Sequence, residues 1–170
     1  DDSDQLYLFR LREHMQRYVE SARLSRLHLD YGRDELCAAV VELLRRNGIR
    51  RDIYVRPYSF ARGIVRQLMV PEDVATETVI DCWPFQSSLR SLKGCKAGVS
   101  SWRRIEDTVT PPRVKAFSNY HNGRFAMMEA KHGGYDSAIM LDGNGKVSEG
   151  PASCLVMVRN GRIVTPSTTS

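Results

Sequence analysis

The order of the hydrophobic patterns along this chain sets the strongest limit on its fold. Apolar residues recur at helical spacing across residues 11–27, and again over a second segment that ends at Asn47-Gly48. Segments rich in strand-forming residues follow at 53–60, 78–83 and 97–102. Helices and strands are therefore grouped unevenly, which predicts an α+β fold in two pieces. The 170 residues are enough for one sizeable core or two small domains.

A polar stretch that ends at Pro111-Pro112 is the best candidate for a linker. We expect domains at 1–107 and 113–170, with the linker at 108–112. The first domain should also contain a short strand at 6–9, and its second helix should begin at Arg33 or Asp34. Further elements of the second domain are expected at 119–132 (helix), 137–141 (strand), 142–145 (turn) and 154–158 (strand). The Asn160-Gly161 pair is a hairpin signal.

The composition argues against several classes of protein. No apolar run reaches membrane-spanning length, and the acidic residues 1–4 do not resemble a signal peptide. The four cysteines include no CxxC pair, and the four histidines lack metal-ligand spacing. We therefore expect a cytoplasmic protein with free thiols, no metal site and no contact with a membrane.

A net charge of +5 raises the alternative of a non-catalytic basic domain that binds nucleic acid. The arginines gather at 45–51, at the C-terminal end of the second helical pattern, where cations complement the helix dipole. No aromatic residues alternate with them, as a binder of single strands requires. This pattern favours a solvated surface and no nucleic-acid partner.

Two side chains of the second domain could carry chemistry. Lys115 has apolar neighbours in the sequence, Val114, Ala116 and Phe117, and a partly desolvated amine can form a Schiff base with a carbonyl group. Glu149 should stand at a strand end. There it is either a turn carboxylate or a group that holds a ring nitrogen protonated.

Three side chains of the first domain could bind an anion. Tyr54 and Arg56 are two residues apart on a predicted strand and therefore share a face. A phenol beside a guanidinium suits a carboxylate. Arg17 is either a surface arginine or an anchor for a phosphate. Taken one at a time, each of these residues is also compatible with a plain surface role.

A succession of motifs gives a more specific indication. In order they are FRLREHMQR (9–17), YVRP (54–57), VSSWRR (99–104), VKAFSNY (114–120), EA (129–130), GYD (134–136), LD (141–142) and EG (149–150). This succession resembles the branched-chain amino acid aminotransferases, which are pyridoxal-phosphate enzymes of fold type IV. The resemblance covers nearly the whole chain. It implies a small α/β domain followed by the start of a larger, β-rich domain.

The resemblance implies a cofactor role for four residues. Lys115 matches the catalytic lysine that forms a Schiff base with pyridoxal 5'-phosphate and moves the proton during the reaction. Tyr120 matches the residue that binds the phenolic oxygen of the cofactor. Glu149 matches the acid on the pyridine nitrogen, and Arg17 matches the arginine on the phosphate.

The resemblance also implies the substrates. Tyr54 and Arg56 match residues that receive substrate carboxylates, and Trp102 matches an aromatic wall of the side-chain pocket. The implied reaction is a ping-pong transamination between a branched-chain or related hydrophobic L-amino acid and a 2-oxo acid such as 2-oxoglutarate. Members of the family are longer at both ends and work as dimers. The chain is thus similar to an internal portion of a longer, homodimeric enzyme.

The sequence departs from the family pattern at two places. Phe117-Ser118 stands where relatives usually have two glycines, and Cys154 stands where an asparagine is common. Two alternatives of the same fold share the lysine and the glutamate: a D-amino-acid aminotransferase and an aminodeoxychorismate lyase. The strand with Tyr54 and Arg56 favours the branched-chain type, whereas the altered turn after Glu149 does not.

Overall fold

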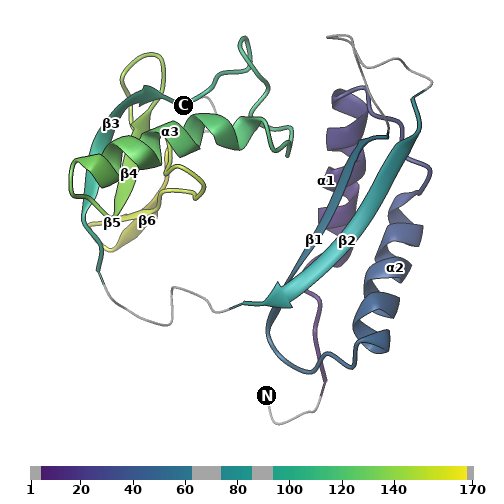
Figure 1. The fold of residues 1–170 in the computed structure, drawn as a ribbon. Helices are drawn as coiled ribbons and strands as arrows, with labels where there is room; N and C mark the ends of the chain where they lie inside the picture. The colour runs from purple at the N-terminus through teal and green to yellow at the C-terminus, as the bar shows by residue number, and fades with distance from the viewer. Residues whose placement is uncertain (1–4, 63–73, 86–93, 168–170) are drawn as a thin grey trace. The chain divides into compact units, whose positions relative to one another are not determined.

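The structure is a computed structural model that describes residues 5–62, 74–85 and 94–167 and forms two compact units, Asp1–Leu92 and Lys93–Ser170 (Figure 1). The elements of the first unit are α1 (Leu11–Leu24), α2 (Arg33–Arg46), β1 (Ile53–Ala61) and β2 (Thr76–Pro84). Those of the second are β3 (Ala97–Arg103), α3 (Asn119–His132), β4 (Ser137–Leu141), β5 (Met157–Arg159) and β6 (Arg162–Val164). None of the helices in these described ranges is long and apolar enough to cross a membrane.

Local residues set both ends of α2. The backbone N–H of Gly32 donates to Glu35 Oε2 at 2.8 Å, which satisfies a backbone donor before the first turn. At the other end Gly48 adopts a φ of 58°, and the N–H of Ile49 donates to the carbonyl of Leu44 at 3.1 Å. The predicted start at Arg33 and the predicted end at Asn47-Gly48 are both confirmed.

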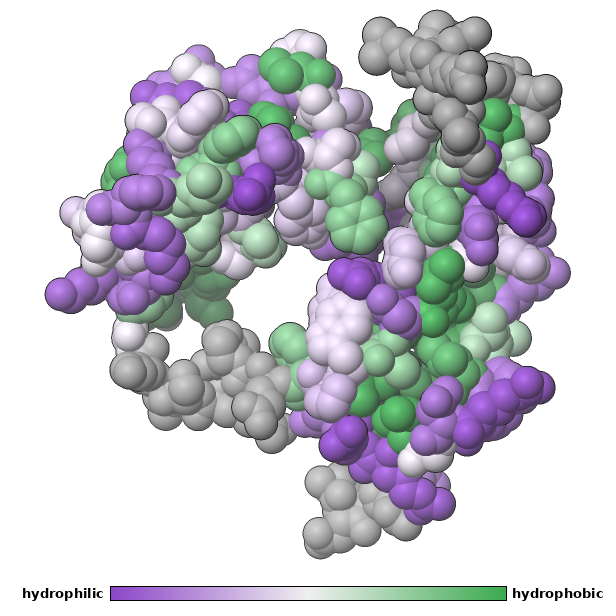
Figure 2. Space-filling view, viewed as in Figure 1, coloured by the Kyte–Doolittle hydropathy of each residue, from purple (hydrophilic) through white to green (hydrophobic). Residues whose placement is uncertain are grey.

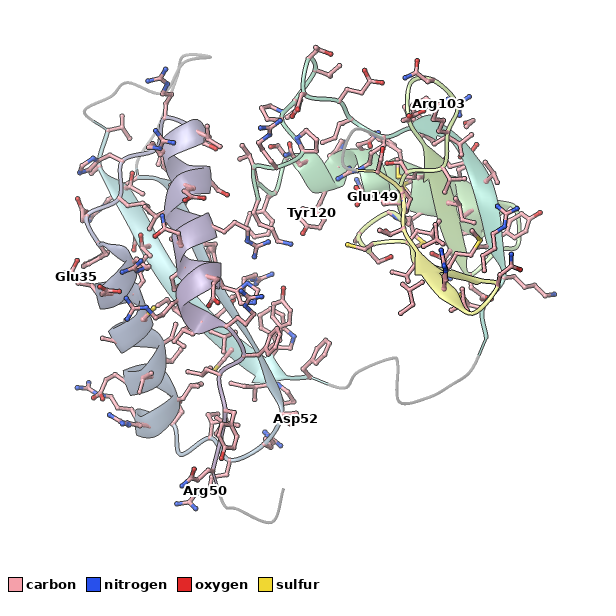
Figure 3. All side chains as sticks on the ribbon, turned by 180° about the vertical axis from the view of Figure 1, so that it is seen from behind. Glu35, Arg50, Asp52, Arg103, Tyr120 and Glu149 are labelled. Carbon is pink, nitrogen blue, oxygen red and sulfur yellow. The ribbon has the colours of Figure 1, made fainter. Side chains whose placement is uncertain are left out.

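The core of the first unit lies between its two helices and one face of the β1–β2 sheet. Its buried side chains are Met15, Leu36, Val40 and Leu44. The two strands pair antiparallel, and alternate residues pack on this core, namely Ile53, Val55, Ile80 and Cys82. In Figure 3, which views the molecule from behind, α1 and α2 lie in front of these strands. Because side chains alternate along a strand, the intervening residues project from the face that the helices leave open.

The second unit is built around a β–α–β arrangement with a core of small residues. β3 and β4 pair in parallel, and α3 connects them. The buried core consists of Ala126, Ala130, Ala138 and Met140. Small side chains allow the helix to lie close to the strands, so that polar contacts can also join them. The C-terminal part of the unit is the β5–β6 hairpin, which confirms the hairpin predicted at Asn160-Gly161; these two residues adopt positive φ values of 51° and 72°.

Two predictions about the fold differ from the structure. Residues 6–8 are irregular and Phe9 lies in a turn, so the strand expected at 6–9 is wrong; the Phe9 side chain is 82% exposed. The strand expected at 154–158 is shorter, because its pairing with β6 begins at Met157. The compact units are Asp1–Leu92 and Lys93–Ser170, and the expected domains at 1–107 and 113–170 remain a prediction.

Candidate active site

The segment before α3 brings a primary amine close to a phenol. Lys115 lies in the irregular stretch just before the helix, and Tyr120 lies in its first turn. The Lys115 Nζ atom is 5.3 Å from the centre of the Tyr120 ring. Both side chains are exposed. The two residues to which the family resemblance gives a role at one cofactor are therefore neighbours in space.

Asn119 fixes the backbone that precedes Lys115. Its side chain is buried, and Nδ2 donates to the carbonyl oxygens of Val114 at 2.8 Å and of Pro111 at 3.0 Å. The N–H of Val114 donates to the same Pro111 carbonyl at 3.1 Å. One amide side chain thus satisfies two carbonyl groups of the loop, and it holds Lys115 at the start of the helix. Asn119 belongs to the motif at 114–120, and no role of its own was predicted for it.

We expected the Lys115 amine to be partly shielded from water, and within this chain it is not. Val114 is buried, whereas Phe117 is 64% exposed and Lys115 is exposed as well. Neighbours in an irregular segment do not share a side, so an apolar sequence context does not produce an apolar environment. The expectation of a desolvated amine is therefore corrected.

Glu149 is held by the strand beside it and by an arginine. The N–H of Met140 donates to the carbonyl of Glu149 at 2.8 Å, and the N–H of Ser148 donates to the carbonyl of Met140 at 3.0 Å. The carboxylate accepts a hydrogen bond from Arg104 Nε. The Glu149 side chain is 31% exposed and that of Arg104 is 16% exposed. The pair therefore fixes the position of the carboxylate and balances its charge in a half-buried setting.

A glycine on α3 lets the chain after Glu149 touch the helix that carries Tyr120. A Cβ atom placed on Gly123 would lie 1.9 Å from the carbonyl oxygen of Pro151, so no side chain fits there. Gly123 is one turn beyond Tyr120, and Pro151 is two residues beyond Glu149. The contact therefore ties the two cofactor candidates to one another through the backbone. Figure 3 shows Tyr120 at the start of α3 and Glu149 on the segment after β4.

Trp102 lies at the end of β3 against an aromatic residue of α3. Its ring stacks on that of Phe125, with centroids 4.8 Å apart, and His121 meets Phe125 edge-on at 4.7 Å. The Trp102 side chain remains partly exposed, which leaves ring surface available to another molecule.

A polar network joins β3 to α3 beside this stack. The Ser100 hydroxyl donates to Glu129 Oε2, and the N–H of Ser101 donates to the same oxygen at 3.0 Å. The Ser100 hydrogen bond is the main cause that lowers the pKa of Glu129, and that of Ser101 acts in the same direction. The network holds the strand end from which Trp102 projects.

In the first unit the structure brings Tyr54 and Arg56 together, as predicted. They project from the open face of the sheet, and Trp83 from the neighbouring strand completes the group. The Tyr54 and Trp83 rings have centroids 4.9 Å apart, and the Arg56 guanidinium lies 4.7 Å from the centre of the Trp83 ring. In Figure 2 apolar and near-neutral residues gather over the strands of this unit, with hydrophilic residues around them.

Arg17 lies apart from this group. It is exposed on α1, where Nη2 is 3.4 Å from His14 Nδ1. α1 packs on the covered face of the sheet, whereas Tyr54 and Arg56 project from the other face. The structure therefore does not join Arg17 to the predicted substrate residues.

Two further observations concern metals and nucleic acids. Within the described ranges no group of three or more His, Cys, Asp or Glu side chains is placed to hold a metal ion. The four cysteines are free thiols. Arg45 and Arg46 occupy the last turn of α2, and Arg46 pairs with Glu42 at 2.6 Å. The basic cluster thus lies at a helix end, as expected.

Known proteins match almost the entire chain. The family described as amino-transferase class IV matches residues 4–170. A probable branched-chain-amino-acid aminotransferase from Aquifex aeolicus is 36% identical over 169 residues, which are 98% of this chain and 53% of that protein. The branched-chain-amino-acid aminotransferase of Escherichia coli strain K12 is 34% identical over 166 residues, with 96% and 53% covered.

Solved structures give a similar result. The branched-chain amino acid aminotransferase of Thermobaculum terrenum in its PLP form superposes with a TM-score of 0.89 at 40% sequence identity. The match covers 96% of this chain and 53% of that one. The chain therefore spans about half the length of the curated relatives it matches.

Proposed function

The chain belongs to the class IV aminotransferases and has the α+β fold of their fold type IV, and from this premise we propose that the complete protein is a pyridoxal-phosphate-dependent aminotransferase. The observation that carries the proposal is the placement of Lys115 beside Tyr120, 5.3 Å from Nζ to the ring centre. The amino donor is a branched-chain or related hydrophobic L-amino acid. The acceptor is a 2-oxo acid, 2-oxoglutarate among them, and the two substrates react in turn by a ping-pong mechanism.

The side chains of the second unit fit this cofactor. The Lys115 amine is exposed, so an aldehyde can reach it. The Glu149 carboxylate is half-buried and held by Arg104, which suits a protonated ring nitrogen. Tyr120 is exposed, and its hydroxyl can donate to a phenolic oxygen. Arg17 belongs to the first unit, and its assignment to the phosphate rests on the family resemblance. When bound, the cofactor supplies an electron sink for the negative charge that develops on the substrate Cα.

In this proposal some residues of the chain bind the cofactor and the substrate, and Lys115 also transfers a proton. Lys115 would hold the aldehyde carbon of the cofactor, and its free amine would accept the proton from the substrate Cα. The Tyr120 ring lies next to that amine, and its hydroxyl orients the cofactor. Tyr54 and Arg56 receive substrate carboxylates on the open sheet face, and Trp102 offers its exposed ring surface to the substrate side chain.

Absorbance and labelling of the complete protein with pyridoxal phosphate test the assignment of Lys115. We expect a visible band, and reduction with borohydride should add the mass of the cofactor to the peptide that contains Lys115. The Lys115→Ala variant should lose the label, and its kcat should fall by at least about 10²-fold. Lys131→Ala, on the exposed end of α3, is the matched control and should keep both. Retained label and turnover in Lys115→Ala would refute the proposal.

The same preparation separates the possible substrates. Turnover with L-leucine, L-isoleucine or L-valine, and none with their D-isomers, is the expected result. A preference for D-amino acids, or release of pyruvate from aminodeoxychorismate, would favour the alternatives of the same fold. Incubation with the amino donor alone should convert one equivalent of cofactor and release the 2-oxo acid, as a ping-pong mechanism requires.

We also propose that the complete protein is a homodimer, which the family resemblance implies. Light scattering during gel filtration measures the molar mass directly. A mass of one subunit would contradict this part of the proposal and leave the chemistry of Lys115 unaffected.

A further inference from the structure

One arginine of the second unit reaches Glu149 across a strand. Arg104 directly follows β3, and its backbone N–H donates to the carbonyl of Leu141 at 2.8 Å, on one edge of β4. The carbonyl of Glu149 accepts from the N–H of Met140 at 2.8 Å, on the opposite edge. The two backbones are therefore two strand spacings apart, roughly 10 Å, which the two long side chains span together. Consecutive residues of β4 thus hold the arginine and the glutamate in place.

Burial of Arg104 restricts the orientation of the Glu149 carboxylate. The Arg104 side chain is more buried than that of Glu149, and its Nη1 atom has no hydrogen-bond partner among the described residues. Asn122 of α3 donates to the carbonyl of Arg103 at 2.9 Å, so the backbone beside Arg104 is fixed as well. If the carboxylate turned away, a largely buried cation would lose its counter-charge, which is strongly unfavourable. Arg104 therefore keeps Glu149 in one orientation.

The ion pair uses one oxygen of the carboxylate and leaves the other for a ligand. Arg104 Nε donates to Glu149 Oε1, and the Glu149 side chain remains partly exposed. A guanidinium is always charged, and its attraction stabilises the ionised form of the carboxylate. An ionised carboxylate only accepts hydrogen bonds. A hydrogen bond between Oε2 and a pyridine nitrogen must then have its proton on the nitrogen, and it is the protonated ring that withdraws electrons most strongly.

From this geometry we infer that Arg104 is a positioning residue for the cofactor. It acts through Glu149: it presents Oε2 to the ring nitrogen and keeps the proton of that contact on the nitrogen. The inference rests on the proposed function, because it takes the ring nitrogen to lie at Glu149. Arg104 belongs to the motif at 99–104, and no role was predicted for it.

Titration of the complete protein, freed of cofactor, with two forms of the cofactor tests the inference. One is pyridoxal 5'-phosphate, and the other is 1-deazapyridoxal 5'-phosphate, in which a C–H group replaces the ring nitrogen. For Arg104→Met we expect the Kd of pyridoxal phosphate to rise at least about fivefold, as the loss of a charge-assisted hydrogen bond predicts. The Kd of the deaza form should change less than about twofold, because it offers no nitrogen to Glu149.

Arg103→Met is the matched control. Arg103 is the neighbouring arginine and is exposed, so its replacement removes the same charge and should change neither Kd. Arg104→Lys keeps a cation beside Glu149 and should restore most of the affinity for pyridoxal phosphate. The ratio of the two Kd values within one variant does not depend on how much of the protein is folded. A variant of reduced stability therefore still tests the inference.

A double variant tests whether Arg104 acts through Glu149. Glu149→Gln alone should weaken the binding of pyridoxal phosphate more than that of the deaza form. When Arg104→Met is added to Glu149→Gln, the Kd of pyridoxal phosphate should change less than about twofold further, because the same contact cannot be lost twice.

Two results would overturn the inference. If Arg104→Met weakens both cofactors equally, or neither, Arg104 does not act on the ring nitrogen. If the effects of Arg104→Met and Glu149→Gln multiply in the double variant, Arg104 acts independently of Glu149. Both titrations measure binding without turnover. Failure of the proposed function is recognised separately, by the absence of borohydride-reduced cofactor on Lys115 of the unaltered protein.

Discussion

The two units of the chain are stabilised internally by different kinds of interaction. The first has a core of large apolar side chains, Met15, Leu36, Val40 and Leu44, between two helices and a sheet. The second has a core of three alanines and one methionine, and specific polar contacts supplement it. Asn119 binds a loop, Asp142 Oδ1 accepts from the N–H groups of Asn144 and Lys146, and Glu129 joins a helix to a strand.

This difference corresponds to the kind of backbone that carries the candidate site residues in each unit. In the first, the candidate residues project from a regular strand, so pairing and apolar burial are enough to place them. In the second, Lys115 and Glu149 lie on irregular backbone, which needs individual hydrogen bonds to hold one conformation. We therefore expect the stability of the first unit to depend on the volume of its buried side chains. The conformation of the second unit should depend on individual hydrogen bonds and close contacts.

Leu36→Ala should have the largest effect on stability and should destabilise the first unit. Leu36 is 2% exposed at the centre of its core. Its truncation should lower the free energy of unfolding by about 2–5 kcal/mol. Hydrogen exchange measured by mass spectrometry should show faster exchange in α1, α2, β1 and β2.

The matched control is Leu36→Met, which keeps the volume and should cost less than about 1.5 kcal/mol. An equal increase in exchange throughout the second unit would show that the two units do not differ in the way described.

Gly123→Ala adds a single methyl group to the second unit and should disturb the site more than the fold. The new Cβ would lie 1.9 Å from the carbonyl oxygen of Pro151, and overpacking of this kind costs about 1–3 kcal/mol. Because Pro151 must move, Glu149 should move with it. Weaker binding of pyridoxal phosphate, measured by absorbance, is the expected sign. Arg124→Ala on the exposed side of the same helix should change stability by less than about 0.5 kcal/mol.

Glu129→Gln should have the smallest effect and a characteristic dependence on pH. Hydrogen bonds from Ser100 and Ser101 lower the pKa of Glu129 in the folded state. A lowered pKa adds stability above the unfolded value, about 4.3, and this stability is lost as the pH falls through the folded value. The melting temperatures of wild type and variant should therefore differ at pH 7 and converge below about pH 4.

Glu20→Gln in α1 serves as the control for loss of a carboxylate elsewhere. A constant difference between wild type and Glu129→Gln across this pH range would show that the Ser100 contact does not depend on the charge.

The sequence predicted most of the regular elements, but it did not indicate how β1, β2, β3 and β4 pair. Hydrophobic spacing and end signals such as Asn47-Gly48 located the helices, and the Asn160-Gly161 pair located the hairpin. These signals are local, so no knowledge of the partner is needed. The strand expected at 6–9 is wrong because β-forming residues adopt a strand only where a neighbouring strand pairs with them. The position of β3 in the second unit depends on its pairing with β4, which sequence spacing does not reveal.

The same restriction to local signals explains which candidate site residues could be predicted from the sequence. Tyr54 and Arg56 share a face because of the strand period, and the motif 114–120 placed Lys115 near Tyr120. Arg104, by contrast, matters through its contact with Glu149, and Gly123 through the carbonyl group that touches it. Both relationships join segments far apart in the chain. Candidate catalytic and binding residues can thus be proposed from motifs, whereas the residues that position them are found only in the fold.

Arg56 and Asp81 stand opposite each other on β1 and β2 and form an ion pair, which protects the alignment of the two strands during folding. A shift of β2 by one residue would turn every side chain of that strand to the opposite face of the sheet. Asp81 would then enter the apolar layer around Leu36 and Val40, and Ile80 would be exposed to water. Burial of an unpaired carboxylate is strongly unfavourable. The charge of Asp81 therefore makes the misaligned pairing of the two strands strongly unfavourable.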